Sequence, residues 1–578
     1  MILHAYDYLF AIGVIFAFLD AWNIGANDVA NSFATSVSSR SLTMMQAMLI
    51  ATVCEFAGAM AVGARVAETI RTKIIPPKLY AANPAMLMLA MVCAVVGSST
   101  YLTIATRLGM PVSTTHSIMG GVIGAGVASV GAAQINWGWT GVSAVFAAWA
   151  IAPGLAGAFG AIIFLITKYG VMRRKNPVKA AFITIPFYFI LTSSLVAMLI
   201  VWKGASSKIK LTNAQVTGTI IGVGFGMGAL VTIFFLPYLW RKLIQGDWQL
   251  KWYHIPLGPL VLRRGEIPPN PGHDLVKNYY AGHLTVEQLE AKRVAALADP
   301  EAALRAPVGD EKLATDATTA KGSDDGSAGP VHHVHHEKPV YKSMIGEKPE
   351  GPWYSAVGLF WWAKRIFLHG VDKDVVGSQG GQSFLSGDLE AMHARAEHHD
   401  NEAEYMFSFL QVLTAATASF AHGANDVSNA VGPFATIFLI WHTGQLGSKT
   451  PVPDWILAFG GVAIILGLWL YGYNIMRNLG NRITLHSPSR GFSMELGSAI
   501  TVILATRLKL PVSTTQCISG ATVGVGLCSG DWRTINWRMV AWIYMGWIIT
   551  LPVTGIISGC LMGIIINAPR WGLAQGAK

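Results

Sequence analysis

Apolar segments long enough to cross a lipid bilayer recur along this sequence. A spanning helix needs about 20 mostly apolar residues, and lipid leaves no partner for an unpaired backbone group except inside a helix or a closed barrel. We therefore predict an all-α polytopic membrane protein with about 12 transmembrane helices. Seven candidate spans precede a long polar stretch and five follow it: 6–24, 44–66, 85–106, 111–132, 141–167, 179–202, 215–240, 404–422, 455–475, 492–508, 511–529 and 537–567.

The composition agrees with a membrane protein. Of the 578 residues, 52% are hydrophobic and 13% charged, whereas soluble proteins carry about 25% charged residues. The net charge of +10 is ascribed to basic residues that hold loops on the cytoplasmic side, so no nucleic-acid partner is expected. The five cysteines lie in apolar surroundings and are interpreted as reduced packing residues.

Polar composition divides the chain into three parts. Residues 1–240 and 403–578 are predicted to be the N-terminal and C-terminal transmembrane halves, and 241–402 a cytoplasmic, largely flexible central loop. In that loop "TVEQLEAKRVAALADPEAALRA" predicts an amphipathic helix, "TDATTAKGSDDGSAG" predicts disorder, and "HHVHH" is read as a solvated linker and not a metal site. Trp361 and Trp362 suggest a piece lying on the membrane surface.

Lysine and arginine in the loops predict the orientation. With the N-terminus outside, the cytoplasmic loops hold more of the basic residues, although four fall on the other side. We expect the N-terminus outside and the central loop in the cytoplasm. The inside residues are Lys168, Arg173, Arg174, Lys175, Lys179, Arg241, Lys242, Arg477, Arg482 and Arg490, and the outside residues are Arg65, Arg71, Lys73 and Lys78.

Two motifs occur twice. GANDVAN at Gly25–Asn31 matches GANDVSN at Gly423–Asn429, and 13 of 22 residues are identical between Ala105–Gly126 and Ala505–Gly526. The chain is therefore an internal duplication. Seven spans, an odd number, separate the starts of the two copies, so the second copy enters from the opposite side. This predicts two inverted-topology repeats, with broken or re-entrant helices and a binding site near the membrane midplane.

The PVSTT motif has the chemistry of an anion site. A proline at the first helical position, followed by three hydroxyls, places free N–H groups and the positive end of a helix dipole together. Helix packing by Ser and Thr is the simpler alternative, but duplication beside a second motif favours binding. The candidates are Ser113, Thr114, Thr115, Ser513, Thr514 and Thr515.

GAND supplies oxygens, which hard cations prefer. Gly25 and Gly423 are expected to allow an unusual backbone conformation. Carboxylates would repel a fully deprotonated anion, unless cations neutralise them or the anion carries a proton. Phosphate near pH 7 carries that proton and sulfate does not, which favours phosphate over sulfate. The candidates are Asn27, Asp28, Asn425 and Asp426, with Asp28 and Asp426 facing both ligands.

Further polar residues stand in apolar segments. Glu55 and Glu495 are candidates for cation binding or proton relay, with pairing to a nearby arginine as the alternative. Arg107 and Arg507 precede the two PVSTT motifs and either steer anions or mark the interface. His116, matched by Gln516, is read as a polar helix contact, and Asp20 and Asn23 as supports of the first GAND motif.

These paired motifs, with "SPSRGFSMEL" and "NWRMVAW", resemble the inorganic phosphate transporter family, in particular its fungal sodium/phosphate symporters. The resemblance covers roughly 1–240 and 403–578. It implies sodium-coupled phosphate symport, inverted repeats, a homodimer, phosphate between the two motif pairs and sodium ions beside it. It also links Glu55 and Glu495 to transport.

We therefore expect a plasma-membrane symporter that moves phosphate inward with sodium by alternating access. The alternatives are proton coupling, sulfate as substrate, a phosphate sensor signalling through the central loop, and a channel. No nucleotide-binding loop, catalytic triad or metal-site spacing occurs, so neither an enzyme nor a cofactor is expected.

Overall fold

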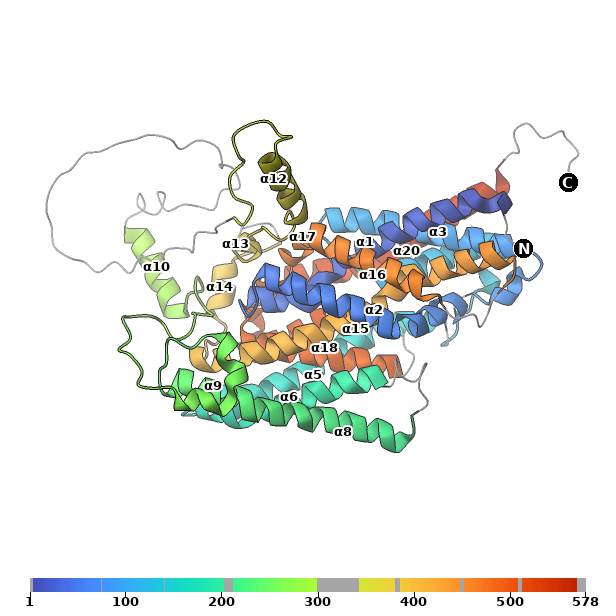
Figure 1. Ribbon diagram of the computed structural model, residues 1–578. Helices are drawn as coiled ribbons and strands as arrows, with labels where there is room; N and C mark the ends of the chain where they lie inside the picture. The colour runs from blue at the N-terminus through green and yellow to red at the C-terminus, as the bar shows by residue number, and fades with distance from the viewer. Residues whose placement is uncertain are drawn as a thin grey trace, which may run out of the picture.

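The computed structural model describes residues 4–568 except 74, 140, 202–210, 299–342, 380–384, 447–451 and 508–511. Within these residues the protein is helical and contains no strand, as predicted. The long helices lie side by side along one direction (Figure 1). Several short helices gather at the end of the bundle away from the two termini.

The first half of the chain supplies most of the long helices. The helices up to the central region are α1 (Asp7–Ser38), α2 (Met44–Lys73), α3 (Pro84–Arg107), α4 (Thr114–Val130), α5 (Val142–Thr167), α6 (Pro177–Leu199), α8 (Asn213–Leu230) and α9 (Leu236–Leu239). π-Helical turns extend α5 through Lys168–Met172 and join α8 to α9 through Val231–Phe235.

The central region and second half contribute short helices followed by long ones. They are α10 (Val286–Ala298), α12 (Ala356–Phe367), α13 (Val375–Gln379), α14 (Leu389–Ala394), α15 (Asn401–Thr443), α16 (Asp454–Tyr471), α17 (Tyr473–Met476), α18 (Pro488–Arg507), α19 (Thr514–Ser529) and α20 (Trp537–Asn567). Helix α10 confirms the helix expected in "TVEQLEAKRVAALA", whereas "TDATTAKGSDDGSAG" and "HHVHH" lie outside the described residues.

Eight helices of the described chain are long and apolar enough to cross a membrane, against the twelve expected. The remaining four expected spans correspond to α4, α15, α18 and α19. Helices α4 and α19 have only 17 and 16 residues, and α15 and α18 carry the polar residues of the motifs. The eight spans are Asp7–Ser38, Met44–Ala64, Pro84–Arg107, Val142–Met172, Pro177–Leu199, Asn213–Ile244, Asp454–Tyr471 and Trp537–Asn567.

The two GAND motifs lie inside continuous helices. We expected a break there, and that expectation is wrong, since α1 and α15 run through the motifs without interruption. The glycines serve close packing instead. A Cβ added at Gly25 would lie 1.9 Å from the Ile464 carbonyl oxygen, and one at Gly423 would lie 2.2 Å from that of Glu55. Only glycine permits such contact between helix backbones.

The helix breaks fall at the PVSTT motifs. Helix α3 ends at Arg107 and α4 begins at Thr114. The two helices form an antiparallel hairpin, joined by a 2.9 Å hydrogen bond between the Ser98 and Ser117 hydroxyls. Helices α18 and α19 form a second hairpin, in which Arg490 Nε donates to Ser529 Oγ at 3.0 Å.

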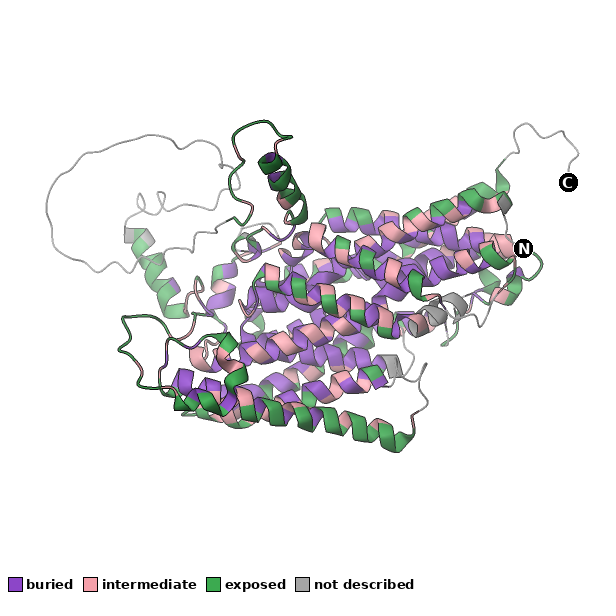
Figure 2. Ribbon diagram, in the orientation of Figure 1, coloured by how far each residue is buried: buried purple, intermediate pink, exposed green. Residues whose placement is uncertain are grey.

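The centre of the bundle is formed by α1 packed antiparallel against α15. Near one end Trp441 Nε1 donates to Asp7 Oδ1 at 2.8 Å, and near the other Ser39 Oγ donates to Gln411 Oε1 at 2.7 Å. Buried residues fill this interior, whereas α8 and α12 present many exposed residues (Figure 2). The first helices of the two sequence repeats are thus in contact and run in opposite directions.

Parts of residues 241–402 pack against the helix ends. Gln379 Nε2 donates to the Ser38 hydroxyl at 3.0 Å, and Tyr280 OH donates to Glu404 Oε1 at 2.8 Å. Glu397 pairs with Lys168 at 2.9 Å and with Arg173 at 2.7 Å. Burial acts to raise the pKa of Glu397, but the hydrogen bonds from Arg173 and Lys168 outweigh it and lower that pKa to about 2. The described part of the region is therefore attached to the bundle.

Replacing Gly25 with alanine is expected to destabilise the protein. The new methyl group would overlap the backbone of α16, and overpacking costs about 1–3 kcal/mol or more when backbone must move. Thermal unfolding of the purified protein in detergent measures this. Gly222→Ala is the control, because a Cβ there meets nothing within 4 Å and alanine is the better helix former. Equal melting temperatures for the two variants would contradict the packing role.

Candidate functional site

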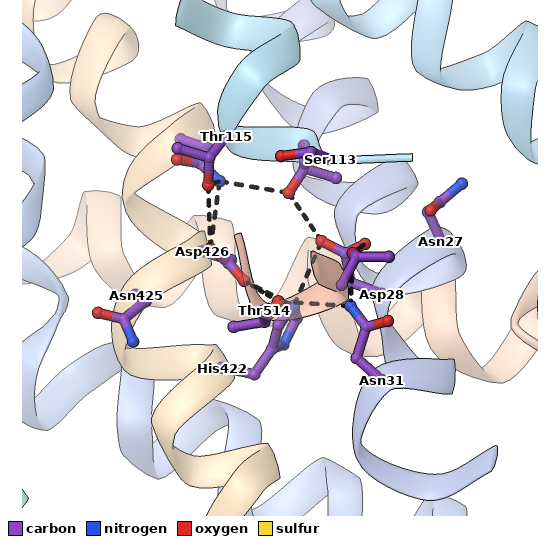
Figure 3. A network of polar contacts seen from close by, with 12 residues as sticks. Asn27, Asp28, Asn31, Ser113, Thr115, His422, Asn425, Asp426 and Thr514 are labelled. Atoms are coloured by element: carbon purple, nitrogen blue, oxygen red, sulfur yellow. Dashed lines mark hydrogen bonds and ion pairs between the residues drawn. The ribbon is translucent and has the colours of Figure 1, made fainter. Parts of the chain in front are cut away.

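Two buried aspartates from the two repeats lie at the centre of the bundle, beside both hairpin tips. Thr114 Oγ1 donates to Asp28 Oδ2 at 2.7 Å, and Thr514 Oγ1 donates to Asp426 Oδ2 at 2.9 Å (Figure 3). Each of these bonds joins a GAND motif to the STT motif of its own repeat. Asp28 and Asp426 are 1% and 2% exposed, respectively, so this contact is screened from bulk water.

The repeats also exchange hydrogen bonds across the centre. Thr115 Oγ1 donates to Asp426 Oδ1 at 3.4 Å, and Thr515 Oγ1 donates to Asp28 Oδ1 at 3.2 Å. The hairpin tips themselves touch, since Thr515 Oγ1 also lies 3.2 Å from the Val112 carbonyl oxygen. Each aspartate is therefore held by one threonine from each repeat.

Two asparagines add further hydrogen bonds between the repeats. Asn31 Nδ2 lies 2.9 Å from Thr515 Oγ1 and 3.3 Å from that of Thr514 (Figure 3). Asn429 Nδ2 lies 3.2 Å from Thr115 Oγ1 and 3.3 Å from that of Thr114. These residues are the last letters of GANDVAN and GANDVSN. Their matching positions in the duplicated motif could have identified them from the sequence, but they were not among the expected site residues.

His422 lies between three carboxyl groups. Its Nδ1 is 2.7 Å from Glu55 Oε2, and its Nε2 is 3.2 Å from Asp426 Oδ2 and 3.5 Å from Asp28 Oδ2. Ser419 Oγ also donates to Glu55 Oε1, at 3.0 Å. Sequence reasoning missed His422 because its position in the first repeat is Ile24, so duplication gave no signal.

The charges at this centre do not balance. A protonated His422 carries one positive charge, whereas Asp28, Glu55 and Asp426 can carry three negative charges. Burying uncompensated charge is costly, so a further cation or proton is required. Oxygen atoms of Asp28 and Asp426 and a ring nitrogen of His422 lie within 4.8 Å of one another, so the three residues could hold one ion when His422 is neutral.

Glu495 lies in a separate polar cluster and not beside the aspartates. It accepts hydrogen bonds from Thr35 at 2.5 Å, Thr414 at 2.6 Å and Ser36 at 2.7 Å. Gln411 Nε2 donates a fourth, at 3.2 Å. The structure therefore does not bring Glu495 together with Asp28 and Asp426, although Thr35 is only two helical turns from Asp28 along α1.

Among the other predicted residues, Asn27 bonds to the first hairpin, whereas Asn425 and Ser113 bond to their own helices. Asn27 holds the first hairpin tip, because its Oδ1 accepts from Val112 N at 3.1 Å and its Nδ2 donates to Thr106 Oγ1 at 3.0 Å. Asn425 Nδ2 donates to the Ala421 carbonyl at 2.9 Å. Ser113 caps α4 by accepting from His116 N at 3.2 Å.

Three further expectations have mixed outcomes. Ser513 is in the N-cap position of α19 without a side-chain capping bond. His116 is buried and both ring nitrogens lack a hydrogen-bond partner, so the expected polar contact is absent there. Its ring instead lies 5.8 Å from that of Trp149. Arg107 is exposed, and the side chain of Arg507 lies outside the described residues.

His422 and Glu55 are expected to be energetically coupled. Removing either partner of a buried ion pair costs about 3–5 kcal/mol, because the other charge stays unpaired. The double replacement His422→Gln with Glu55→Gln should therefore cost at least about 1 kcal/mol less than the sum of the single replacements. Unfolding in denaturant, in detergent, measures this. His442→Gln, on an exposed residue of α15, is the matched control, and strictly additive losses would contradict the coupling.

Comparison with known proteins finds a matching family and relatives over nearly the whole chain. The chain matches the Phosphate transporter family over residues 24–558. It is 61% identical to the phosphate-repressible phosphate permease pho-4 of Neurospora crassa, over 99% of this chain and 100% of the relative. It is 29% identical to sodium-dependent phosphate transporter 1-A of Danio rerio, over 96% and 94% of the two chains.

A solved structure is also similar. The chain resembles the structure described as "The sodium-dependent phosphate transporter", with 26% identity, a TM-score of 0.64 and coverage of 97% of this chain and 100% of the other. These relatives are named as a permease and as transporters, and not as enzymes. The family match alone covers most of the sequence. The chain therefore belongs to the phosphate transporter family.

Proposed function

We propose that this protein imports inorganic phosphate together with sodium, by alternating access to the site between Asp28 and Asp426. The protein is a membrane transporter and not an enzyme. The observation that carries the proposal is the shared set of four threonine hydroxyls. They are donors that an oxyanion can use, and they are held by carboxylates that a cation can neutralise.

Phosphate would bind where α4 and α19 begin. Both helices start at a threonine of an STT motif, so their N-terminal dipoles and hydroxyls face the same central point. The proposed phosphate residues are Asp28, Asp426 and the two STT triplets Ser113–Thr115 and Ser513–Thr515. A monoprotonated phosphate could also donate its proton to one aspartate.

Sodium would bind before phosphate, because the hydroxyls that phosphate needs are engaged by carboxylates. The threonine hydroxyls now donate to Asp28 and Asp426. A hydroxyl has one hydrogen and rotates to suit its partner, so it cannot serve carboxylate and phosphate together. A cation on the carboxylates would free the hydroxyls for phosphate. Such competition couples the two ligands without a direct bond between them.

The proposed sodium ligands differ in their present contacts and in their position relative to the centre. Candidate ligand atoms of Asp28, Asp426 and His422 lie within 4.8 Å of one another. Glu55 contacts His422 at 2.7 Å and so lies one contact further from the aspartates. Asn27 supports the hairpin tip, so its contribution would require that tip to shift. Glu495 and Asn425 stand further out and are proposed to act on cations passing toward or from the centre.

Alternating access would use the inverted relation of the repeats. Helices α1 and α15 run antiparallel, as inverted repeats require. The four threonine–aspartate bonds and the contact between hairpin tips are the interactions that a rocking motion would exchange. We further propose a homodimer in the plasma membrane, with the N-terminus outside and residues 241–402 in the cytoplasm.

The other functions predict different behaviour. A proton-coupled transporter would respond to a proton gradient and not to sodium. A channel could not drive phosphate against an opposing sodium gradient. A sensor would keep full uptake and lose only signalling when the central loop is removed.

Sodium-driven uptake into proteoliposomes tests the proposal. With sodium and proton gradients imposed separately, we expect phosphate to accumulate only with inward sodium. Asp28→Asn and Asp426→Asn should each reduce uptake to background, because each removes a carboxylate from the cation site. Asp454→Asn, on the exposed start of α16, should transport normally. Accumulation driven by protons alone would overturn sodium coupling, and normal uptake by either aspartate variant would remove that residue from the site.

Phosphate should be preferred over sulfate. An acceptor-only anion cannot donate to Asp28 or Asp426, and an unmatched buried acceptor pair costs about 1–3 kcal/mol, or roughly 5- to 150-fold in affinity. Competition of unlabelled sulfate against labelled phosphate at pH 7 measures this. Phosphate keeps its last proton well above pH 7, so the preference should persist at mildly alkaline pH. Equal competition by both anions would contradict the role of that proton.

A further inference from the structure

Asp20 is a buried carboxyl group without a partner. It lies on α1 with 0% of its side chain exposed, and neither of its oxygens accepts a hydrogen bond. Among the described residues no Lys, Arg or His forms an ion pair with it. Asp28 is eight residues further along the same helix, about 12 Å away at 1.5 Å per residue, so Asp20 is outside the central site.

The groups around Asp20 present oxygen. Ser98 of α3 lies beside its carboxyl group, and the Ser98 hydroxyl is 2.9 Å from that of Ser117 on α4. Asn23, one helical turn from Asp20, has a buried Oδ1 without a partner. The Asn23 amide hydrogens are directed elsewhere, to the Leu19 carbonyl at 2.9 Å and Thr103 Oγ1 at 2.9 Å.

These buried acceptor oxygens favour the binding of a positive charge. Three acceptor oxygens, two of Asp20 and one of Asn23, are buried on one face of α1 without a geometrically formed hydrogen bond, and the Ser98 hydroxyl lies beside those of Asp20. A buried acceptor without a donor is costly, and more so if it is charged. Inside a membrane an ionisable residue of this kind marks an ion pathway by default. Carboxylate, amide and hydroxyl oxygens together suit a hard cation.

We propose that Asp20, Asn23 Oδ1 and the Ser98 hydroxyl form a second cation site, which takes sodium. The site lies between the central aspartates and the end of α1 that carries Asp7. The inference rests on sodium being the coupling ion, as proposed above, and adds a binding position to that function.

The second cation site would belong to one repeat only. The position 398 residues after Asp20 is Ala418, and the one after Asn23 is Ala421. The second repeat therefore has no equivalent carboxylate there. A site on one side of the centre would load sodium from that side before the central site is filled, so the two ends of the pathway would differ.

Equilibrium binding of radioactive sodium to the purified full chain, without phosphate, tests the site. Removing a ligand or a supporting group typically weakens metal binding about 10–100-fold. Asp20→Asn should therefore lose one bound sodium, or raise the sodium concentration for half binding at least about tenfold. Ser98→Ala should weaken binding in the same direction. Thr100→Val is the matched control, because the Thr100 hydroxyl donates only to its own helix, at the Val96 carbonyl.

The outcomes separate this site from the proposed function. Unchanged sodium number and affinity in Asp20→Asn would overturn the site, even if sodium drives phosphate uptake. A shift only in the pH dependence of uptake would likewise overturn it, in favour of proton binding. Loss of sodium by Asp20→Asn would support the site even if uptake by the wild type proved independent of sodium. Should Asp20→Asn fail to fold, Ser98→Ala and Asp20→Glu decide: weakened binding by Ser98→Ala supports the site, and unchanged binding by both overturns it.

Discussion

The fourfold contact between two aspartates and four threonines is the interaction on which the rest of this structure depends. Asp28 and Asp426 each accept one threonine hydroxyl from their own repeat and one from the other. Carboxylates in an apolar bundle are stable only with such donors or with cations. Breaking the contact would remove four hydroxyl donors from these two buried carboxylates. These four hydrogen bonds therefore hold α1 and α15 against the starts of α4 and α19.

The rest of the bundle is built to bring that contact about. Glycines at the GAND motifs let α1 and α15 approach α16 and α2 until backbone atoms touch. The helical hairpins end at the centre, so the N-termini of α4 and α19 face the aspartates. The polar residues of the centre come from the uninterrupted helices α1 and α15 and from the first turns of α4 and α19, while long apolar helices surround them. Four expected spans are consequently shorter or more polar than an ordinary transmembrane helix.

The two repeats match at the centre and differ around it. Thr114, Thr115 and Asn31 have direct counterparts in Thr514, Thr515 and Asn429. By contrast, His422 and its partner Glu55, and likewise Asp20 and Asn23, have no equivalents in the other repeat. A transport cycle needs both properties. Under the alternating access proposed above, symmetry would allow two similar closed forms, and asymmetry would let the two directions differ in ion binding.

The sequence by itself determined the fold class, the duplication and the site motifs. Apolar length requires helices in lipid, and thirteen identities in 22 residues cannot come from shared hydrophobicity. It could not determine that GAND lies within unbroken helices, since glycine suits both a bend and a close contact. Nor could it place His422 beside Glu55, because they are 367 residues apart and unmatched in the repeat. Such partners depend on which helix faces pack together, and that is decided only in the tertiary structure.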